Sequence, residues 1–130
     1  MAQAIILLGH GSRARVDEAN RLLEEMVDLL KERVRAGAVL PAWMNSRSGR
    51  PGLREVGARL AEEGFTEIIV APWFLTSGLH IQEDIPAILA ELRERYPQVK
   101  FVLAKPLGVD PRIADILAER IEEVQNAVHA

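Results

Sequence analysis

Apolar and polar residues alternate along the chain in blocks that predict four strands separated by helices. Runs rich in apolar residues at 3–8, 66–71 and 99–104 are typical of parallel strands that are buried on both faces. A weaker strand is predicted at 39–44, where Pro41 favours an edge position because proline cannot donate a hydrogen bond to a neighbouring strand. Between these runs, apolar residues recur three and four positions apart, as they do on one face of an amphipathic helix.

The helices are predicted over 14–34, from Leu53 to a C′ residue at Gly64, from Asp84 to Tyr96, and from Asp110 to Val128. Glycine suits the C′ position because it adopts positive φ angles without strain. Asp84 can cap the third helix with its carboxylate, and Pro86 is tolerated in the first turn. The last helix carries an apolar face made by Ile113, Ile116, Leu117, Ile121, Val124 and Val128.

A strand followed by a helix, repeated four times, predicts an α/β fold of three layers. The sheet is expected to be parallel and four-stranded, flanked by helices on both sides and joined by right-handed crossovers. A length of 130 residues fits a single domain over 1–130.

Two histidines near glycine follow two of the predicted strands. His10 stands in a Gly-His-Gly-Ser segment directly after the first strand, and His80 follows Gly78 in the loop after 66–71. Ligands of an open parallel sheet bind beyond the carboxyl ends of its strands, so both loops are expected at one cleft. Two imidazoles there indicate metal or proton chemistry. The first segment also suits a phosphate-binding loop at a helix N-terminus, with His10 incidental.

Composition narrows the chemistry further. The absence of cysteine excludes disulfides, thiolate metal sites and cysteine nucleophiles. With a net charge of −3, the chain lacks the positive charge that is typical of nucleic-acid-binding proteins. No apolar run reaches the ~20 residues of a membrane span. Without an export signal at its start, the chain is expected in the cytoplasm. Arginines near the proposed sheet edge suit an anionic small molecule, although ordinary solvated arginines would give the same pattern.

Three segments resemble the small sirohydrochlorin cobaltochelatases of the CbiX type, a class II chelatase family: His10 in its Gly-His-Gly-Ser setting, Pro72-Trp73-Phe74-Leu75, and Gly78-x-His80-x-x-x-Asp84-Ile85-Pro86. The resemblance covers the whole chain in length and element order. It implies a chelatase-like fold, a homodimer, and a lyase that inserts a divalent metal ion into a sirohydrochlorin-type tetrapyrrole without ATP. Co(II) is the metal expected first, with Ni(II) and Fe(II) as alternatives and no organic cofactor. Cobalamin biosynthesis is the implied setting.

His10 and His80 match the two active-site histidines of that family, which implies a catalytic and metal-binding role for both. Sirohydrochlorin carries several carboxylates, which arginine can bind in a bidentate manner. The candidate substrate-binding residues are Ser12, Arg13, Arg47, Arg50, Ser77 and Gly78. Trp43, Trp73, Phe74 and Leu79 are candidates for apolar cover of the macrocycle, although aromatic residues at such positions more often belong to the core.

One position departs from the family pattern. Asn45 stands where the family usually has an acidic residue, and asparagine cannot accept a proton as a carboxylate does. Either Glu83 or solvent replaces that function, or the chain is a non-catalytic metal- or tetrapyrrole-binding protein on the same fold. A histidine phosphatase is a further alternative, but that chemistry requires an arginine beside the histidine, and the neighbours of His10 are glycines.

Overall fold

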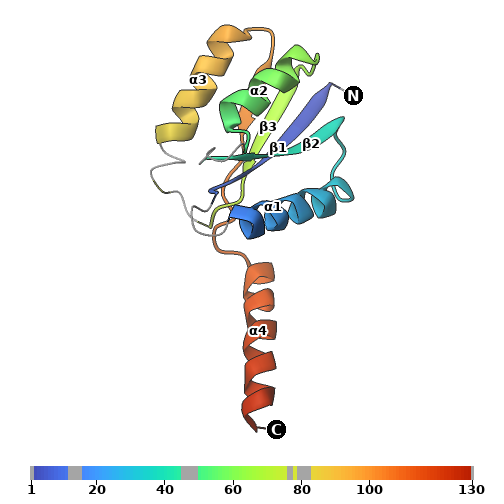
Figure 1. Cartoon of the computed structure of the whole chain (residues 1–130), viewed down its shortest axis with the longest axis vertical. Coiled ribbons are helices and arrows are strands. Elements are labelled where there is room, and N and C mark those ends of the chain that lie inside the picture. The colour runs from blue at the N-terminus through green and yellow to red at the C-terminus, as the bar shows by residue number, and fades with distance from the viewer. Residues whose placement is uncertain (1, 12–15, 45–49, 76–77, 79–82, 130) are drawn as a thin grey trace.

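In the part of the chain that the structure describes, four strands alternate with four helices, as predicted (Figure 1). The elements are β1 (Gln3–Gly9), α1 (Val16–Lys31), β2 (Ala38–Trp43), α2 (Leu53–Glu62), β3 (Glu67–Pro72), α3 (Ile85–Arg95), β4 (Lys100–Leu103) and α4 (Pro111–His129). The computed structural model describes all residues except 1, 12–15, 45–49, 76–77, 79–82 and 130, and all side chains in the helices except those of 16–19 and 127–129.

The strands form one parallel sheet in the order β2-β1-β3-β4. β1 is flanked on both sides and is buried from Ala4 to Gly9, which explains its apolar sequence. β2 lies at an edge, which confirms the position predicted from Pro41. Leu8 is level with Ala42 on one neighbour and with Pro72 on the other, so the carboxyl ends of three strands meet at the same sheet edge.

The two faces of the sheet bury different side chains because successive residues of a strand point to opposite faces. Ile6 and Leu8 belong to the larger core cluster, which α2 and α3 complete with residues such as Leu60 and Leu89. The smaller cluster, on the other face, contains Ile5, Leu7, Val39 and Trp43 from the sheet and Leu23 and Val27 from α1. The fold therefore has the predicted three layers, with α2 and α3 above the sheet and α1 below it (Figure 1).

The ends of two helices test the predicted caps. Gly64 has a φ of +102° directly after the last turn of α2, and the N–H of Phe65 donates to the carbonyl of Leu60 at 3.2 Å, which confirms the C′ glycine. The capping role predicted for Asp84 is wrong. Its dihedral angles are already helical (φ −69°, ψ −47°), and its carboxylate makes no capping hydrogen bond. A capping residue needs an extended backbone to direct its side chain at the N–H groups of the first turn.

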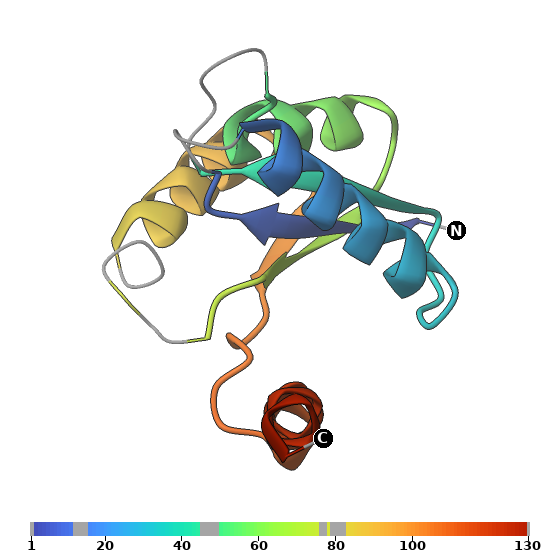
Figure 2. The ribbon, with the colours of Figure 1, turned by 60° about the horizontal axis from the view of Figure 1, so that its bottom comes forward.

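α4 forms as predicted, but its apolar stripe is not covered. The helix projects away from the body of the molecule, and Figure 2 shows it end-on and apart from the sheet. Ile116, Leu117, Ile121 and Val124 on this stripe are all exposed. Neither α4 nor any other helix in the described part of the chain combines the length and apolar character that a membrane span requires.

Candidate functional site

The residues that follow β1, β2 and β3 lie together at the carboxyl edge of the sheet. Hydrogen bonds extend the strand pairing by one step, because the N–H of Met44 donates to the carbonyl of Gly9 and the N–H of Trp73 donates to the carbonyl of Leu8, both at 2.8 Å. The N–H of Trp43 donates at 3.0 Å to the carbonyl of Pro51, which brings the start of α2 to the same edge. His10 therefore follows β1 between the ends of its two neighbouring strands, β2 and β3.

His10 is an exposed side chain that stacks on a buried ring. The imidazole lies against Phe74 with ring centroids 4.0 Å apart and an angle of 27° between the ring planes. Phe74 is only 6% exposed and belongs to the larger core cluster. This contact orients the imidazole from one face while its position at the surface keeps it accessible to a ligand.

Glycine is favoured on each side of His10, for a different physical reason in each case. Gly11 has a φ of +80°, a left-handed conformation that side chains rarely adopt. A Cβ at Gly9 would lie 3.1 Å from Cδ2 of Leu23, so a side chain there would press on α1. The Gly-His-Gly segment thus turns the chain sharply at the strand end while α1 packs close beneath it.

A shallow pocket of about 280 Å³ opens beside His10. Its lining is mainly apolar and comes from the strand ends, the residues that follow them and the first half of α1: Gly9, His10, Gly11, Leu22, Leu23, Trp43 and Trp73. Trp43 is buried within the smaller core cluster, and Trp73 packs against that cluster. The pocket lining thus includes two of the residues predicted as apolar cover, Trp43 and Trp73, while their role toward a macrocycle stays a prediction. Leu22 and Leu23 were not anticipated as lining residues. The apolar periodicity of α1 gave the signal, because its stripe begins next to the sheet edge.

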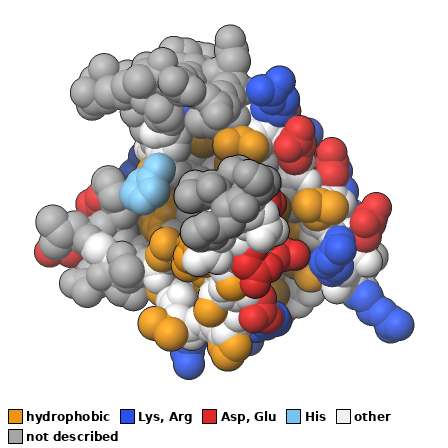
Figure 3. Space-filling model, turned by 90° about the horizontal axis from the view of Figure 1, so that it is seen from below, with side chains coloured by type: hydrophobic (Ala, Val, Ile, Leu, Met, Phe, Trp, Pro, Cys, Tyr) orange, Lys and Arg blue, Asp and Glu red, His pale blue; other side chains and the backbone are white. Residues whose placement is uncertain are grey.

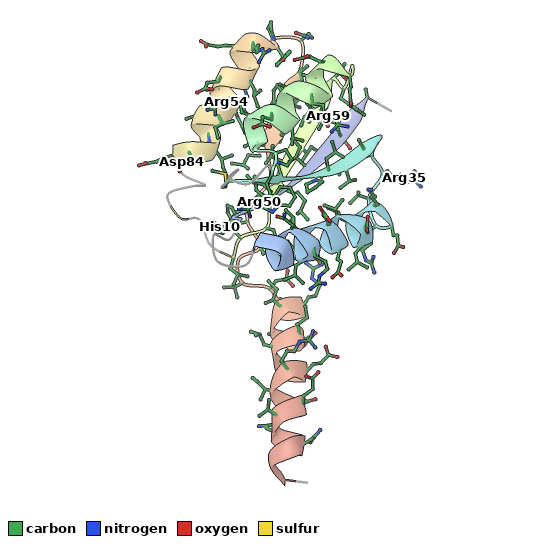
Figure 4. The ribbon with its side chains drawn as sticks, in the orientation of Figure 1. His10, Arg35, Arg50, Arg54, Arg59 and Asp84 are labelled. Carbon is green, nitrogen blue, oxygen red and sulfur yellow. The ribbon has the colours of Figure 1, made fainter. Side chains whose placement is uncertain are left out.

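Arg50 does not form an exposed rim. It directly precedes Pro51, whose carbonyl accepts the hydrogen bond from Trp43 at the carboxyl edge of the sheet, and Figure 4 labels it together with His10. The side chain of Arg50 is only 4% exposed, whereas the sequence interpretation placed it on a basic surface. Residues 50–52 run alongside the end of β2, as the pairing of Trp43 with Gly52 shows, and this course carries Arg50 inward.

Only some of the remaining predicted site residues lie among those that the structure describes. Gly78 and Glu83 are exposed, on the segment that leads into α3. His80, Ser12, Arg13, Arg47, Ser77 and also Asn45 and Leu79 lie outside the described residues. The pairing of His10 with His80 therefore stays a prediction. Among the described residues, no group of three or more histidine and carboxylate side chains is arranged to hold a metal ion.

A larger hollow, of about 620 Å³, lies over α2 and reaches α3, but charged side chains of its lining form ion pairs with other protein side chains. Its lining includes Arg54, which contacts Glu91 at 2.7 Å, and Arg59, which contacts Glu63 at 3.3 Å. The hydrogen bond from Arg54 lowers the pKa of the Glu91 carboxyl group. These ion pairs join surface side chains to one another, so the smaller pocket beside His10 is the better candidate for a ligand.

Comparisons with known proteins identify the family to which the chain belongs. The sequence model of the CbiX family matches residues 4–124. The chloroplastic sirohydrochlorin ferrochelatase of Arabidopsis thaliana is 31% identical over 121 residues, which cover 93% of this chain and 52% of that protein. The sirohydrochlorin cobaltochelatase of Methanosarcina acetivorans is 33% identical over 127 residues, which cover 92% of this chain and 94% of that protein.

A solved structure shows the same architecture. The sirohydrochlorin chelatase SirB from Bacillus subtilis subspecies spizizenii, in complex with cobalt, has a TM-score of 0.85 and 27% sequence identity to this chain. The match covers 95% of this chain and 51% of that one. The chain thus spans about half the length of the plant and Bacillus proteins and nearly all of the Methanosarcina protein.

Proposed function

The chain belongs to the CbiX family, and we propose that it inserts a divalent metal ion into a sirohydrochlorin-type tetrapyrrole without ATP. The observation that carries this proposal is His10, an exposed imidazole held over Phe74 at the mouth of an apolar pocket. The relatives supply the substrate class, since they are named as sirohydrochlorin chelatases.

The reaction requires a group that accepts protons beside a surface that binds the macrocycle. Metallation removes two pyrrole N–H protons and places a dication between the four nitrogens. A neutral imidazole can accept a proton near neutral pH and can also ligate Co(II), Ni(II) or Fe(II). We assign this role to His10 together with His80, which the family resemblance pairs with it. A site with few protein ligands releases its metal readily, as delivery to a substrate demands.

The macrocycle is flat and apolar at its centre and carboxylated at its periphery. Trp43, Trp73 and Leu22 line the pocket beside His10 and would cover part of one macrocycle face. Arg13 and Arg47 remain the candidates for the peripheral carboxylates, with Ser12, Ser77 and Gly78 as hydrogen-bonding partners. Arg50 would act from below the surface, through its positive charge, because its side chain is buried.

We propose Co(II) as the preferred metal and a homodimer as the working form. The Methanosarcina protein, whose length the chain nearly spans, is named as a cobaltochelatase. The ferrochelatase of Arabidopsis is about twice as long as the matched region. Two copies of this chain would together supply the length of such a protein, which supports a dimer.

The proposal is tested by anaerobic visible spectroscopy of sirohydrochlorin mixed with Co(II), with and without the protein. We expect the protein to accelerate metallation, and both His10→Ala and His80→Ala to lower the rate by about 100-fold or more, the usual contribution of a positioned acid or base. His129→Ala is the matched control, since it removes the third histidine of the chain and is expected to keep the wild-type rate.

Two results would contradict the proposal in different ways. Full metallation by His10→Ala would remove the role assigned to this side chain. Absorption shifts on binding without any gain in rate would identify a tetrapyrrole-binding protein, with Asn45 as the first residue to change to glutamate. Parallel assays with Ni(II) and Fe(II) rank the metals, and a faster rate with either would overturn the preference for Co(II).

A further inference from the structure

Leu22 of α1 forms the solvent-facing wall of the pocket beside His10. The pocket has four large apolar lining residues, Leu22, Leu23, Trp43 and Trp73. Leu23 and Trp43 are only 2% and 3% exposed and belong to the smaller core cluster, and Trp73 packs against that cluster. Leu22, in contrast, is 49% exposed. It is therefore the apolar residue of this lining with the most surface available to a ligand.

The packing of its neighbour in the sequence fixes the position of Leu22. Successive residues of an α-helix are turned by about 100° around the helix axis, so Leu22 points sideways where Leu23 points into the core. Leu23 packs closely under the end of β1, where a Cβ at Gly9 would lie 3.1 Å from its Cδ2. The contact that holds α1 against the sheet therefore also holds Leu22 at the rim of the pocket.

The pocket is small and apolar for a tetrapyrrole. Its volume of about 280 Å³ lies below the range of about 300–1,000 Å³ that is typical of sites for drug-sized ligands. A tetrapyrrole with its substituents is larger than such ligands, so the pocket receives one edge of the macrocycle.

None of the described residues that line this pocket is lysine, arginine, aspartate or glutamate. A carboxylate placed among these residues would lose hydration without gaining an ion pair from them. Figure 3 shows hydrophobic side chains at the surface next to the exposed histidine. The pocket therefore suits an uncharged part of the substrate.

Sirohydrochlorin has uncharged substituents on its two reduced rings. Each of these rings carries a methyl group, whereas the other substituents of the macrocycle carry carboxylates. The methyl group shares its carbon with an acetate, and the two project to opposite faces of the macrocycle. A methyl group can therefore enter an apolar pocket while the acetate stays in water. Uroporphyrin III has the same acetate and propionate substituents without these methyl groups.

We propose that Leu22 is a specificity-determining residue that contacts a methyl-bearing reduced ring of the substrate. This inference rests on the proposed function and names the part of the substrate that the pocket receives. Because His10 lines the same pocket, a ring edge seated on Leu22 lies beside the imidazole. One methyl group in an apolar pocket changes affinity by about tenfold or more, so this contact favours sirohydrochlorin over tetrapyrroles that lack the methyl groups.

The absence of cysteine allows a direct test of the contact. Leu22→Cys introduces a single thiol into the full-length chain, and its rate of reaction with a thiol reagent is measured with and without metal-free sirohydrochlorin. Leu29→Cys is the matched control, because Leu29 is 47% exposed and lies on nearly the same face of α1, about 10 Å further along. At ten times the dissociation constant, we expect sirohydrochlorin to slow the reaction of Leu22→Cys by about fivefold or more and to leave that of Leu29→Cys unchanged.

A second measurement tests specificity without metal. Fluorescence titration gives the ratio of the affinities for sirohydrochlorin and uroporphyrin III. We expect the wild-type protein to favour sirohydrochlorin by about tenfold, and Leu22→Ala to reduce this preference by about threefold or more. Leu22→Met nearly conserves the apolar volume and is expected to keep the preference, as is Leu29→Ala.

Several results would overturn the proposal. Equal protection of the two thiols, or none for Leu22→Cys, would place the macrocycle elsewhere. A thiol of Leu22→Cys that is unreactive before sirohydrochlorin is added would mean that protein covers this position. An unchanged preference in Leu22→Ala would remove the role in specificity. In all these cases the wild-type protein still binds sirohydrochlorin and the chelatase assignment stands, whereas a wild-type protein that does not bind it would contradict the proposed function as well.

Discussion

The contact between His10 and Phe74 links the stability of the core to the position of the candidate acid–base group, and its free energy is measurable. The ring centroids are 4.0 Å apart, and the planes are inclined by only 27°, which is a stacked arrangement. Stacked aromatic pairs contribute about 0.5–1.5 kcal/mol beyond the burial of their area. We expect a coupling energy in this range from a double-mutant cycle with His10→Ala and Phe74→Leu.

The single variants differ because the two residues differ in burial. His10 is exposed, so His10→Ala removes the stack without opening a cavity and is expected to lower the free energy of unfolding by about 1 kcal/mol. Phe74 is buried, and leucine keeps much of its volume, so Phe74→Leu is expected to cost about 2 kcal/mol, from the stack and imperfect repacking together. Phe74→Ala would leave a cavity and cost about 3–5 kcal/mol, which makes it the poorer probe.

Urea denaturation followed by far-ultraviolet circular dichroism measures these free energies. The protein concentration is kept fixed because the proposed subunit association would shift the transition. Phe74→Leu with His129→Ala is the control cycle, for which the coupling is expected to be zero within about 0.3 kcal/mol. A coupling equally small between His10 and Phe74 would refute the reasoning that the stack holds the imidazole. A coupling in the expected range also predicts that Phe74→Leu slows metallation while the fold persists.

Three further variants test other parts of the structure. Gly57→Ala places a Cβ 2.7 Å from Cδ1 of Leu92, which is expected to cost about 1–3 kcal/mol by overpacking. This cost outweighs the gain of about 1 kcal/mol in helix propensity, so the midpoint of urea denaturation should fall. Leu60→Ala empties a fully buried site and should cost about 3 kcal/mol in the same assay. The hydrogen bonds from Arg112 hold the pKa of Asp110 well below its usual range. The ionised carboxylate therefore stabilises the start of α4 at neutral pH, and this stabilisation declines as the pH falls below about 4. We expect the helical circular dichroism to decrease over this pH range. Asp110→Asn cannot ionise at this position and should not show that decrease.

Each of these three predictions has a result that would contradict it. A higher urea midpoint for Gly57→Ala would mean that Leu92 moves aside without cost. A loss below about 1 kcal/mol for Leu60→Ala would mean that the core collapses around the missing side chain. An acid transition of α4 that is identical in Asp110→Asn would assign the pH dependence to other carboxylates.

The order and type of the elements followed from the sequence because they depend on local periodicity. A short run of apolar residues is typical of a strand that is buried on both faces. Apolar residues spaced three and four positions apart lie on one face only in a helix. Pro41 predicted the edge position of β2 since it has no N–H for a neighbouring strand, and Gly64 predicted the end of α2 since it tolerates a positive φ. The same reasoning located His10 at the carboxyl edge of the sheet, because that position depends only on the strand that precedes it.

Other features depend on contacts between segments that are distant in the sequence, and only the tertiary structure decided them. The stack of His10 on Phe74, the burial of Arg50 and the helical backbone of Asp84 each arise from how loops cross the sheet edge. The sequence of α4 determined an amphipathic helix, but a stripe does not specify which surface covers it. In this chain the exit at Leu107 and Gly108 carries that stripe away from its own sheet, because backbone hydrogen bonds to the segment after β3 set the direction of the helix.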